Sequence, residues 1–213
     1  MRLAFLFQGS LFVLALGLGW GFDIPLWQRC HISLEAIGWG LLATLPMLVF
    51  LSLMVRTQVR SLVEIREILQ DYLGRRLVEC RFIDLLILSL LAGVSEECLF
   101  RGFIEPMLGL VSPLLGIVGC NILFGLCHAV TRTYALMAAL MGVYLSLTMW
   151  LTKEPNLLIP IVSHTLYDLV AFIVFRNSFS ALKAISVPRS ESPQPSTDQR
   201  ESSSSTITQD SVT

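Results

Sequence analysis

Three clusters of polar residues interrupt apolar stretches of this 213-residue sequence, and each contains groups that can exchange protons. The clusters are Glu96, Glu97 and Arg101 in SEECLFR, Phe124 and His128 in FGLCH, and His164 and Asp168 in HTLYD. Ionisable side chains are costly in an apolar setting, so they mark candidate functional sites. Carboxylates and imidazoles together can serve as general acids and bases. The clusters therefore favour acid–base chemistry.

The spacing of the first cluster predicts different roles for its two glutamates. Neighbouring residues on a helix point about 100° apart, whereas residues four apart share a face. Glu97 is therefore predicted to form a structural ion pair with Arg101. Glu96 lacks that partner and is predicted to face the histidines as a base.

The other two clusters also have helical spacing. His164 and Asp168 are four residues apart, so the carboxylate can fix the tautomer and orientation of the imidazole. Phe124 is predicted to lie against His128 on one helix face. The chain has three histidines, and the third, His31, falls in a predicted loop. The other two histidines both belong to polar clusters, and this favours one common site.

The elements that carry these clusters are long and apolar. Apolar residues make up 54% of the chain and charged residues 15%, and the mean hydropathy is +0.70. Helices of about 20 apolar residues can cross a hydrocarbon core of roughly 30 Å. The sequence predicts an all-α, polytopic membrane helix bundle with six transmembrane helices, at residues 3–20, 37–55, 82–103, 108–130, 134–151 and 157–175.

Basic residues predict the orientation of the bundle. Twelve of the 15 Lys and Arg residues fall on one predicted side, and cytoplasmic loops carry such an excess. Both termini are therefore expected to be cytoplasmic, which requires an even number of spans. The net charge of −1 and the absence of a basic stripe predict no nucleic-acid partner. The lipid bilayer is the expected surrounding.

The sequence divides into four predicted regions. Residues 1–55 hold two spans, residues 56–81 form a cytoplasmic amphipathic linker, residues 82–176 form a four-helix core, and residues 177–213 form a disordered cytoplasmic tail. Gly74 is predicted to stop the linker helix. The apolar stripe of the linker could sink into the membrane interface or pack against the protein itself.

The three motifs, in this order on successive apolar segments, resemble those of the CPBP intramembrane proteases, also called Abi or CAAX-protease-like. They read Glu96-Glu97-x-x-x-Arg101, Phe124-x-x-x-His128 and His164-x-x-x-Asp168. The family includes the eukaryotic enzymes that trim prenylated CAAX proteins. The resemblance covers residues 82–175. Many members carry Asn in place of Asp168, where a carboxylate could strengthen the neighbouring histidine as a base or bind a metal.

This resemblance implies an intramembrane endopeptidase acting on membrane-associated proteins or C-terminal peptides. It implies that Glu96 and His128 activate water, while His164 and Asp168 polarise the carbonyl or stabilise its oxyanion. The supporting residues are then Glu97, Arg101 and Phe124.

The sequence leaves two possibilities for the cofactor: the protein uses none, or it binds a divalent cation such as Zn²⁺. If a metal is bound, its ligands are expected to be Glu96, His128, His164 and Asp168. The lack of a local H-E-x-x-H signature favours a metal-independent glutamate mechanism.

Two alternatives compete with this interpretation. Ser95, in GVSEE, could act as a rhomboid-type nucleophile. The protein could also be non-hydrolytic, either a bacteriocin-immunity-type binding scaffold or a proton-coupled transporter, because buried carboxylates and histidines can relay protons. The compact layout is typical of a bacterial inner membrane or organellar protein.

Overall fold

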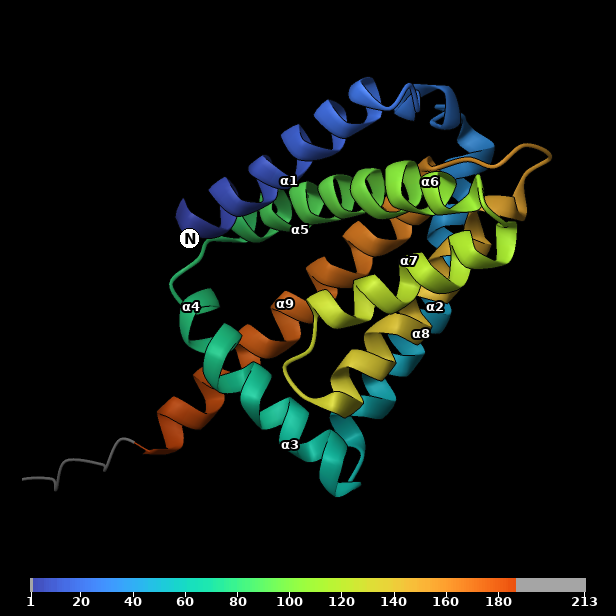
Figure 1. Ribbon diagram of the computed structural model, residues 1–213. Coiled ribbons are helices and arrows are strands. Elements are labelled where there is room, and N and C mark those ends of the chain that lie inside the picture. Colours follow the sequence, from blue (N-terminus) through green and yellow to red (C-terminus); the bar gives the residue numbers. More distant parts are fainter. Residues whose placement is uncertain (1, 187–213) are drawn as a thin grey trace, which may run out of the picture.

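The computed structural model describes residues 2–186 and consists of helices joined by short loops (Figure 1). Residues 2–186 contain no β-strand, which confirms the predicted all-α class. The longer helices are α1 (Arg2–Gly21), α2 (Leu34–Arg56), α3 (Arg60–Leu69), α5 (Phe82–Glu97), α7 (Pro113–Cys127), α8 (Arg132–Thr148) and α9 (Leu158–Ser186). The shorter ones are α4 (Arg75–Leu77), α6 (Glu105–Gly109), the 3₁₀ turns η1 (Leu26–Arg29) and η4 (Met149–Leu151), and the π-helical segments η2 (Gln70–Gly74) and η3 (Cys98–Ile104).

Within residues 2–186, four helical segments are long and apolar enough to cross a membrane, so the predicted number of six is not confirmed. They are Arg2–Gly21, Leu34–Arg56, Arg132–Leu151 and Leu158–Ala181. The helices α5 and α7 have 16 and 15 residues. At a rise of 1.5 Å per residue α7 is roughly 23 Å long, short of a core of roughly 30 Å, whereas α5 continues without a break into η3 and α6. These two shorter helices carry Glu97 and Phe124 of the predicted site.

A turn at residues 110–112 interrupts the predicted fourth span. The helix that starts as α5 continues through η3 and α6 as far as Gly109. Ser112 then caps α7 by accepting a hydrogen bond from the backbone N–H of Leu115, and Pro113 takes the first helical position. Both residues are favoured at a helix start. Local capping therefore places the boundary between these two helices at residues 110–112, a few residues later than the predicted boundary at residues 104–107.

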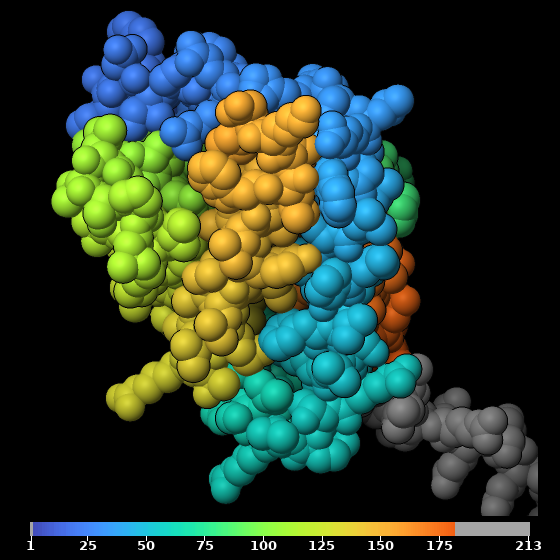
Figure 2. Space-filling view, turned by 90° about the vertical axis from the view of Figure 1, so that its right-hand side faces the viewer, coloured from blue at the N-terminus to red at the C-terminus, as the bar shows by residue number. Residues whose placement is uncertain are grey.

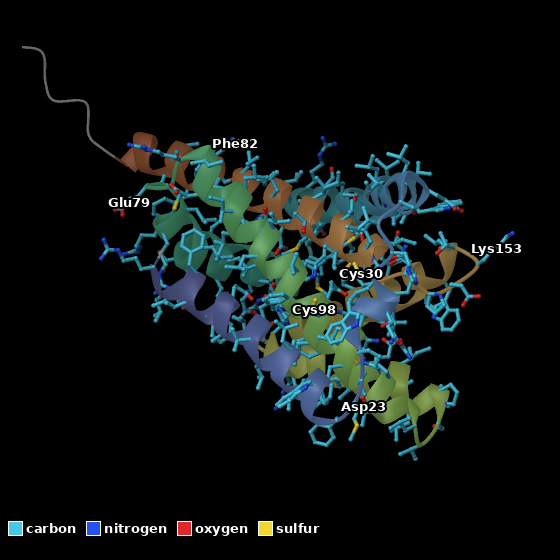
Figure 3. The ribbon with its side chains drawn as sticks, turned by 90° about the horizontal axis from the view of Figure 1, so that it is seen from above. Asp23, Cys30, Glu79, Phe82, Cys98 and Lys153 are labelled. Carbon is cyan, nitrogen blue, oxygen red and sulfur yellow. The ribbon has the colours of Figure 1, made fainter. Side chains whose placement is uncertain are left out.

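The helix α9 lies at the centre of the bundle and packs against α2 and α5. The helix α1 lies along α5 and η3, and α7 pairs with α8 (Figure 1). Figure 2 shows α2 and α8 side by side on one face, with α3 below them. In Figure 3, Glu79 and Phe82 mark one end of the bundle, and Asp23 and Lys153 mark the other.

The start of α1 and the end of α9 lie on the same side of the bundle in Figures 1 and 3. This arrangement agrees with an even number of crossings, while the cytoplasmic location of that side stays a prediction. The helix α9 extends to Ser186, so residues 177–186 are helical although they belong to the predicted tail. The rest of that predicted tail lies outside the described residues.

The predicted helix stop at Gly74 is wrong. Gly74 has helical dihedral angles (φ −56°, ψ −42°), and the helical path continues into α4. A Cβ atom there would lie 2.7 Å from the Cβ of Phe179 in α9, so this glycine permits close packing instead of ending a helix. Ile65 and Leu69 of α3 are also buried within the protein. Part of the apolar stripe of the linker therefore packs against the protein itself.

Candidate active site

The guanidinium of Arg101 is fully buried and joins η3 to three other helices. Its Nη1 donates to Oε1 of Glu97, one turn earlier, at 3.0 Å. Its Nη2 donates to Oδ1 of Asn121 in α7 at 2.9 Å and to the carbonyl oxygen of Gly142 in α8 at 2.8 Å. A buried cation needs paired and hydrogen-bonded surroundings. The predicted ion pair is present, and it also fixes α5, α7 and α8 relative to one another.

Four residues of this network belong to none of the three sequence motifs. Asn121 donates from Nδ2 to Oγ of Ser146 at 2.9 Å, and Ser146 donates to Oε2 of Glu105 at 2.6 Å. An amide within an apolar helix is the signal that could have indicated Asn121. Gly142 belongs to the same network because a Cβ atom there would lie 2.8 Å from Nη2 of Arg101.

His164 contacts two carboxylates on opposite sides of its ring. Its Nδ1 donates to Oε1 of Glu97 at 2.7 Å, and its Nε2 lies 3.6 Å from Oδ2 of Asp168. The same Oε1 atom accepts from Arg101, so Glu97 bridges the guanidinium and the imidazole. The closer carboxylate therefore comes from another helix, whereas the spacing along α9 predicts Asp168 as the residue that orients the ring.

His128 lies at the end of α7, where the helix no longer continues. Its Nδ1 is 2.8 Å from the carbonyl oxygen of Phe124, which can only accept, so Nδ1 carries the proton and Nε2 the lone pair of a neutral ring. The two rings are 4.4 Å apart between centroids, as the spacing predicts. Nε2 of His128 lies 3.7 Å from Oε2 of Glu96.

The two oxygens of Glu96 have different surroundings. Oε1 accepts a hydrogen bond from Nε2 of Gln8 in α1 at 2.8 Å. Oε2 is buried and has no hydrogen-bond partner among the described side chains and backbone. Glu96 is the last but one residue of α5. The π-helical segment η3 follows α5 and begins at Cys98, which Figure 3 shows in the middle of the bundle. Single π-helical turns often occur at functional sites.

A cavity of about 80 Å³ lies beside both histidines. His128, His164 and Asp168 form its polar wall, and Met47 and Phe50 of α2 belong to its apolar wall. A second cavity of about 230 Å³ shares these two α2 residues and extends between α2 and α8. These two helices lie next to each other on the face shown in Figure 2. The two cavities therefore adjoin along shared apolar residues, one beside the polar residues and the other between two candidate membrane-spanning helices.

The four residues predicted as catalytic lie around one place in the fold. Glu96 contacts His128, and His164 contacts Asp168, while Phe124 lies between the two histidine rings with centroid distances of 4.4 and 6.3 Å. Three helices far apart in the sequence, α5, α7 and α9, supply them. Their catalytic roles remain predictions.

Ser95 lacks the surroundings that a serine nucleophile needs. It is fully buried, and its hydroxyl donates to Oε1 of Gln8 at 2.6 Å and lies 3.3 Å from the carbonyl oxygen of Ala92. Within residues 2–186 it makes no hydrogen bond to a histidine. A serine nucleophile requires such a base at hydrogen-bond distance.

The donor set does not fit a resident metal ion as the side chains stand. Among the described residues, no three or more His, Cys, Asp or Glu side chains are grouped closely enough to hold one. Zinc in proteins takes three or four such ligands at about 2.0–2.3 Å. The metal-independent mechanism that the sequence favours therefore stays a prediction, and no step of the proposed mechanism passes through a metal.

The fold and the site together define a helical integral membrane protein with a buried centre of glutamates and histidines. Residues 79–170 match the family described as Rce1-like, type II CAAX prenyl endopeptidase. The match spans all three motifs and confirms the resemblance to the CPBP proteases. Neither a curated protein nor a solved structure matches the chain significantly. The family supports an intramembrane endopeptidase activity of the CAAX-protease type in general terms.

Proposed function

We propose that this protein hydrolyses a peptide bond near the C terminus of a membrane-associated substrate, using water activated by Glu96 and His128. One observation carries this proposal. A buried carboxylate oxygen without a hydrogen-bond partner, Oε2 of Glu96, faces the unprotonated nitrogen of His128 at 3.7 Å. Two proton acceptors that converge without bonding each other are suited to hold a molecule that can donate to both.

A water molecule fits this requirement. The separation of 3.7 Å is too long for a direct hydrogen bond, but a water beside the two atoms can lie within hydrogen-bond distance of both. Its oxygen lone pairs then point away from Glu96 and His128 and can attack a carbonyl carbon in the cavity. The proton removed from the water goes to one of these two residues and later to the nitrogen of the leaving amine.

His164 is placed to act on the carbonyl oxygen of the substrate. It lines the cavity with Asp168, and its Nδ1 is held by Glu97. When the ring is doubly protonated, Nε2 can donate to the oxygen on which negative charge develops. The buried network around Arg101 keeps Glu97, and through it the imidazole, in a fixed position.

The apolar cavities support a proposed route by which a substrate reaches these residues. Met47, Met137 and Met141 line both of them, and methionine adapts to irregular apolar shapes. A C-terminal CAAX peptide with a prenyl chain suits this space, because the chain can reside between α2 and α8 while the peptide meets the histidines. The substrate class named by the family thus becomes the proposed substrate class of this protein.

Cleavage of a defined peptide tests the proposal. The purified full-length chain, reconstituted in liposomes, is expected to cleave an internally quenched peptide that ends in a prenylated CAAX sequence. His128→Ala is expected to lower kcat by about 100-fold or more, because the water loses one acceptor. Cys127→Ala changes the exposed neighbouring residue and is the matched control. Wild-type protein that cleaves neither this peptide nor its unprenylated form would favour the non-hydrolytic alternative.

Metal removal gives a separate prediction. Prolonged treatment with a chelator, followed by elemental analysis, is expected to leave kcat within about twofold of its starting value, because Glu96 and His128 supply the acid–base groups themselves. Loss of activity that returns on adding Zn²⁺, with one metal per chain, would contradict a metal-independent mechanism.

A further inference from the structure

The contact between Gln8 and Glu96 joins the candidate base to a helix outside the family match. Gln8 lies in α1, whereas the match covers residues 79–170. The helix α1 packs along α5 and η3, and Gln8 is half-buried at this contact. The hydrogen bond from its Nε2 to Oε1 of Glu96, at 2.8 Å, spans 88 residues of sequence.

The partners of Gln8 define the direction of each hydrogen bond. The hydroxyl of Ser95 donates to Oε1 of Gln8 at 2.6 Å, so this side-chain oxygen is the acceptor. The other end of the amide is then the NH₂ group, which can only donate, and it points at Oε1 of Glu96. Ser95 and Gln8 therefore form a chain of donors that ends on one particular carboxylate oxygen.

This chain separates the two oxygens of Glu96. Oε1 is held by the amide, and Oε2 is left without a partner at 3.7 Å from Nε2 of His128. Among the residues that the structure describes, Gln8 is the single side chain that donates to Glu96. Without it, rotation of the carboxylate about its last torsion is not opposed by any donor, and that torsion has a broad energy minimum.

We infer that Gln8 is a positioning residue for the proposed hydrolysis: its amide holds Oε1 of Glu96 so that Oε2 faces His128 and the attacking water. The inference rests on the proposed function for its consequence in catalysis, but the contact itself does not depend on it. Gln8 does not contact the cavity that would hold the substrate. Its loss is therefore expected to act on the chemical step and not on substrate binding.

Two variants separate the possible roles of the amide. Gln8→Leu removes both hydrogen bonds, and leucine suits the apolar helix around it. Gln8→Glu has the same length and keeps an acceptor for Ser95, but it replaces the donor to Glu96 by an oxygen. Ser10→Leu is the matched control, because Ser10 is exposed on the same helix and its hydroxyl donates only to the carbonyl oxygen of Phe7.

Kinetics on the prenylated CAAX peptide provide the first measurement. Both Gln8 variants are expected to lower kcat by about 10- to 100-fold with KM unchanged, as expected for loss of one hydrogen bond to a charged group. Ser10→Leu is expected to leave both constants unchanged. Wild-type kcat in folded Gln8→Leu and Gln8→Glu would overturn the inference, as would a rise in KM alone.

Infrared spectroscopy provides a measurement that needs no activity. The carboxylate bands of Glu96 are isolated by subtracting the spectrum of the same protein carrying Glu96→Gln. They are expected to shift in Gln8→Leu, because Oε1 loses its donor, and to stay in place in Ser10→Leu. Unchanged bands in Gln8→Leu would overturn the inference even if activity fell through a general loss of structure.

The two measurements distinguish failure of this inference from failure of the proposed function. Shifted bands in a protein whose wild-type form does not cleave the peptide would leave Gln8 as the residue that positions Glu96 and would reject the proposed hydrolysis. Cleavage by the wild type, with kcat and carboxylate bands unchanged in Gln8→Leu, would support the proposed hydrolysis and reject Gln8 as the residue that positions Glu96. If Gln8→Leu does not fold, the isosteric Gln8→Glu decides by the same two measurements.

Discussion

Replacing Glu96 by glutamine is expected to lower kcat/KM for the prenylated CAAX peptide by about 1000-fold, within the range known for loss of a general base. Glutamine has the same shape, and its side-chain oxygen can still accept the hydrogen bond from Gln8. What it lacks is the ability to take a proton from water at the position of Oε2. The measurement is the rate of peptide cleavage by the purified variant, together with its melting temperature.

The controls for this variant use the same chemical change elsewhere. Glu64→Gln alters an exposed glutamate on α3 and is expected to keep wild-type activity. The double variant of Glu96→Gln and His128→Ala is expected to be little slower than the slower single variant, because both residues act on one water. A folded Glu96→Gln protein with wild-type kcat/KM would remove Glu96 from the mechanism.

Replacing Arg101 by leucine is expected to destabilise the protein by about 3–5 kcal/mol, the range for breaking a buried ion pair. The guanidinium and its partner Glu97 are completely buried, and one side of the guanidinium also satisfies Asn121 and the carbonyl oxygen of Gly142. Leucine would leave a buried carboxylate without its cation. Chemical unfolding in detergent measures the change in free energy of unfolding.

The chain contains a matched control for this variant. Arg75 and Asp71 form a second ion pair with the same four-residue spacing, but both side chains are about 70% exposed (70% and 71%). Arg75→Leu is expected to change stability by less than about 1 kcal/mol, because exposed pairs are solvated and contribute little. Similar destabilisation by the two variants would mean that Arg101 does not depend on its buried network.

Contacts within one helix were predictable because helix geometry determines them. The pair of Glu97 with Arg101 and the stacking of Phe124 on His128 both follow from a four-residue spacing, and the structure contains both. The number of spans was less predictable. Hydropathy does not show that α7 is only 15 residues long, because it does not detect the serine cap and the proline that start this helix at Pro113 inside an apolar stretch.

Partners from different helices could not be derived from spacing. Glu97 was expected to pair with Arg101, and its Oε1 also accepts a hydrogen bond from His164, which is 67 residues away in the sequence. Gln8 has no motif around it, and its only signal was an amide in a predicted span. Asn121 is likewise an amide in a predicted span, and its partner Arg101 lies on another helix. Such contacts depend on how helices pack, which many side chains determine together.

The amino-acid sequence by itself determined an apolar, all-helical chain with its polar residues in three helical clusters, because hydrophobicity and the 3.6-residue period are local properties. The tertiary structure alone decided which oxygen of Glu96 faces His128, and that His164 bonds to Glu97 more closely than to Asp168. Those features follow from the positions of α1, α5, α7 and α9 relative to one another. A shift of about one ångström between packed helices would change each of these hydrogen bonds, since their strength falls steeply with distance and angle.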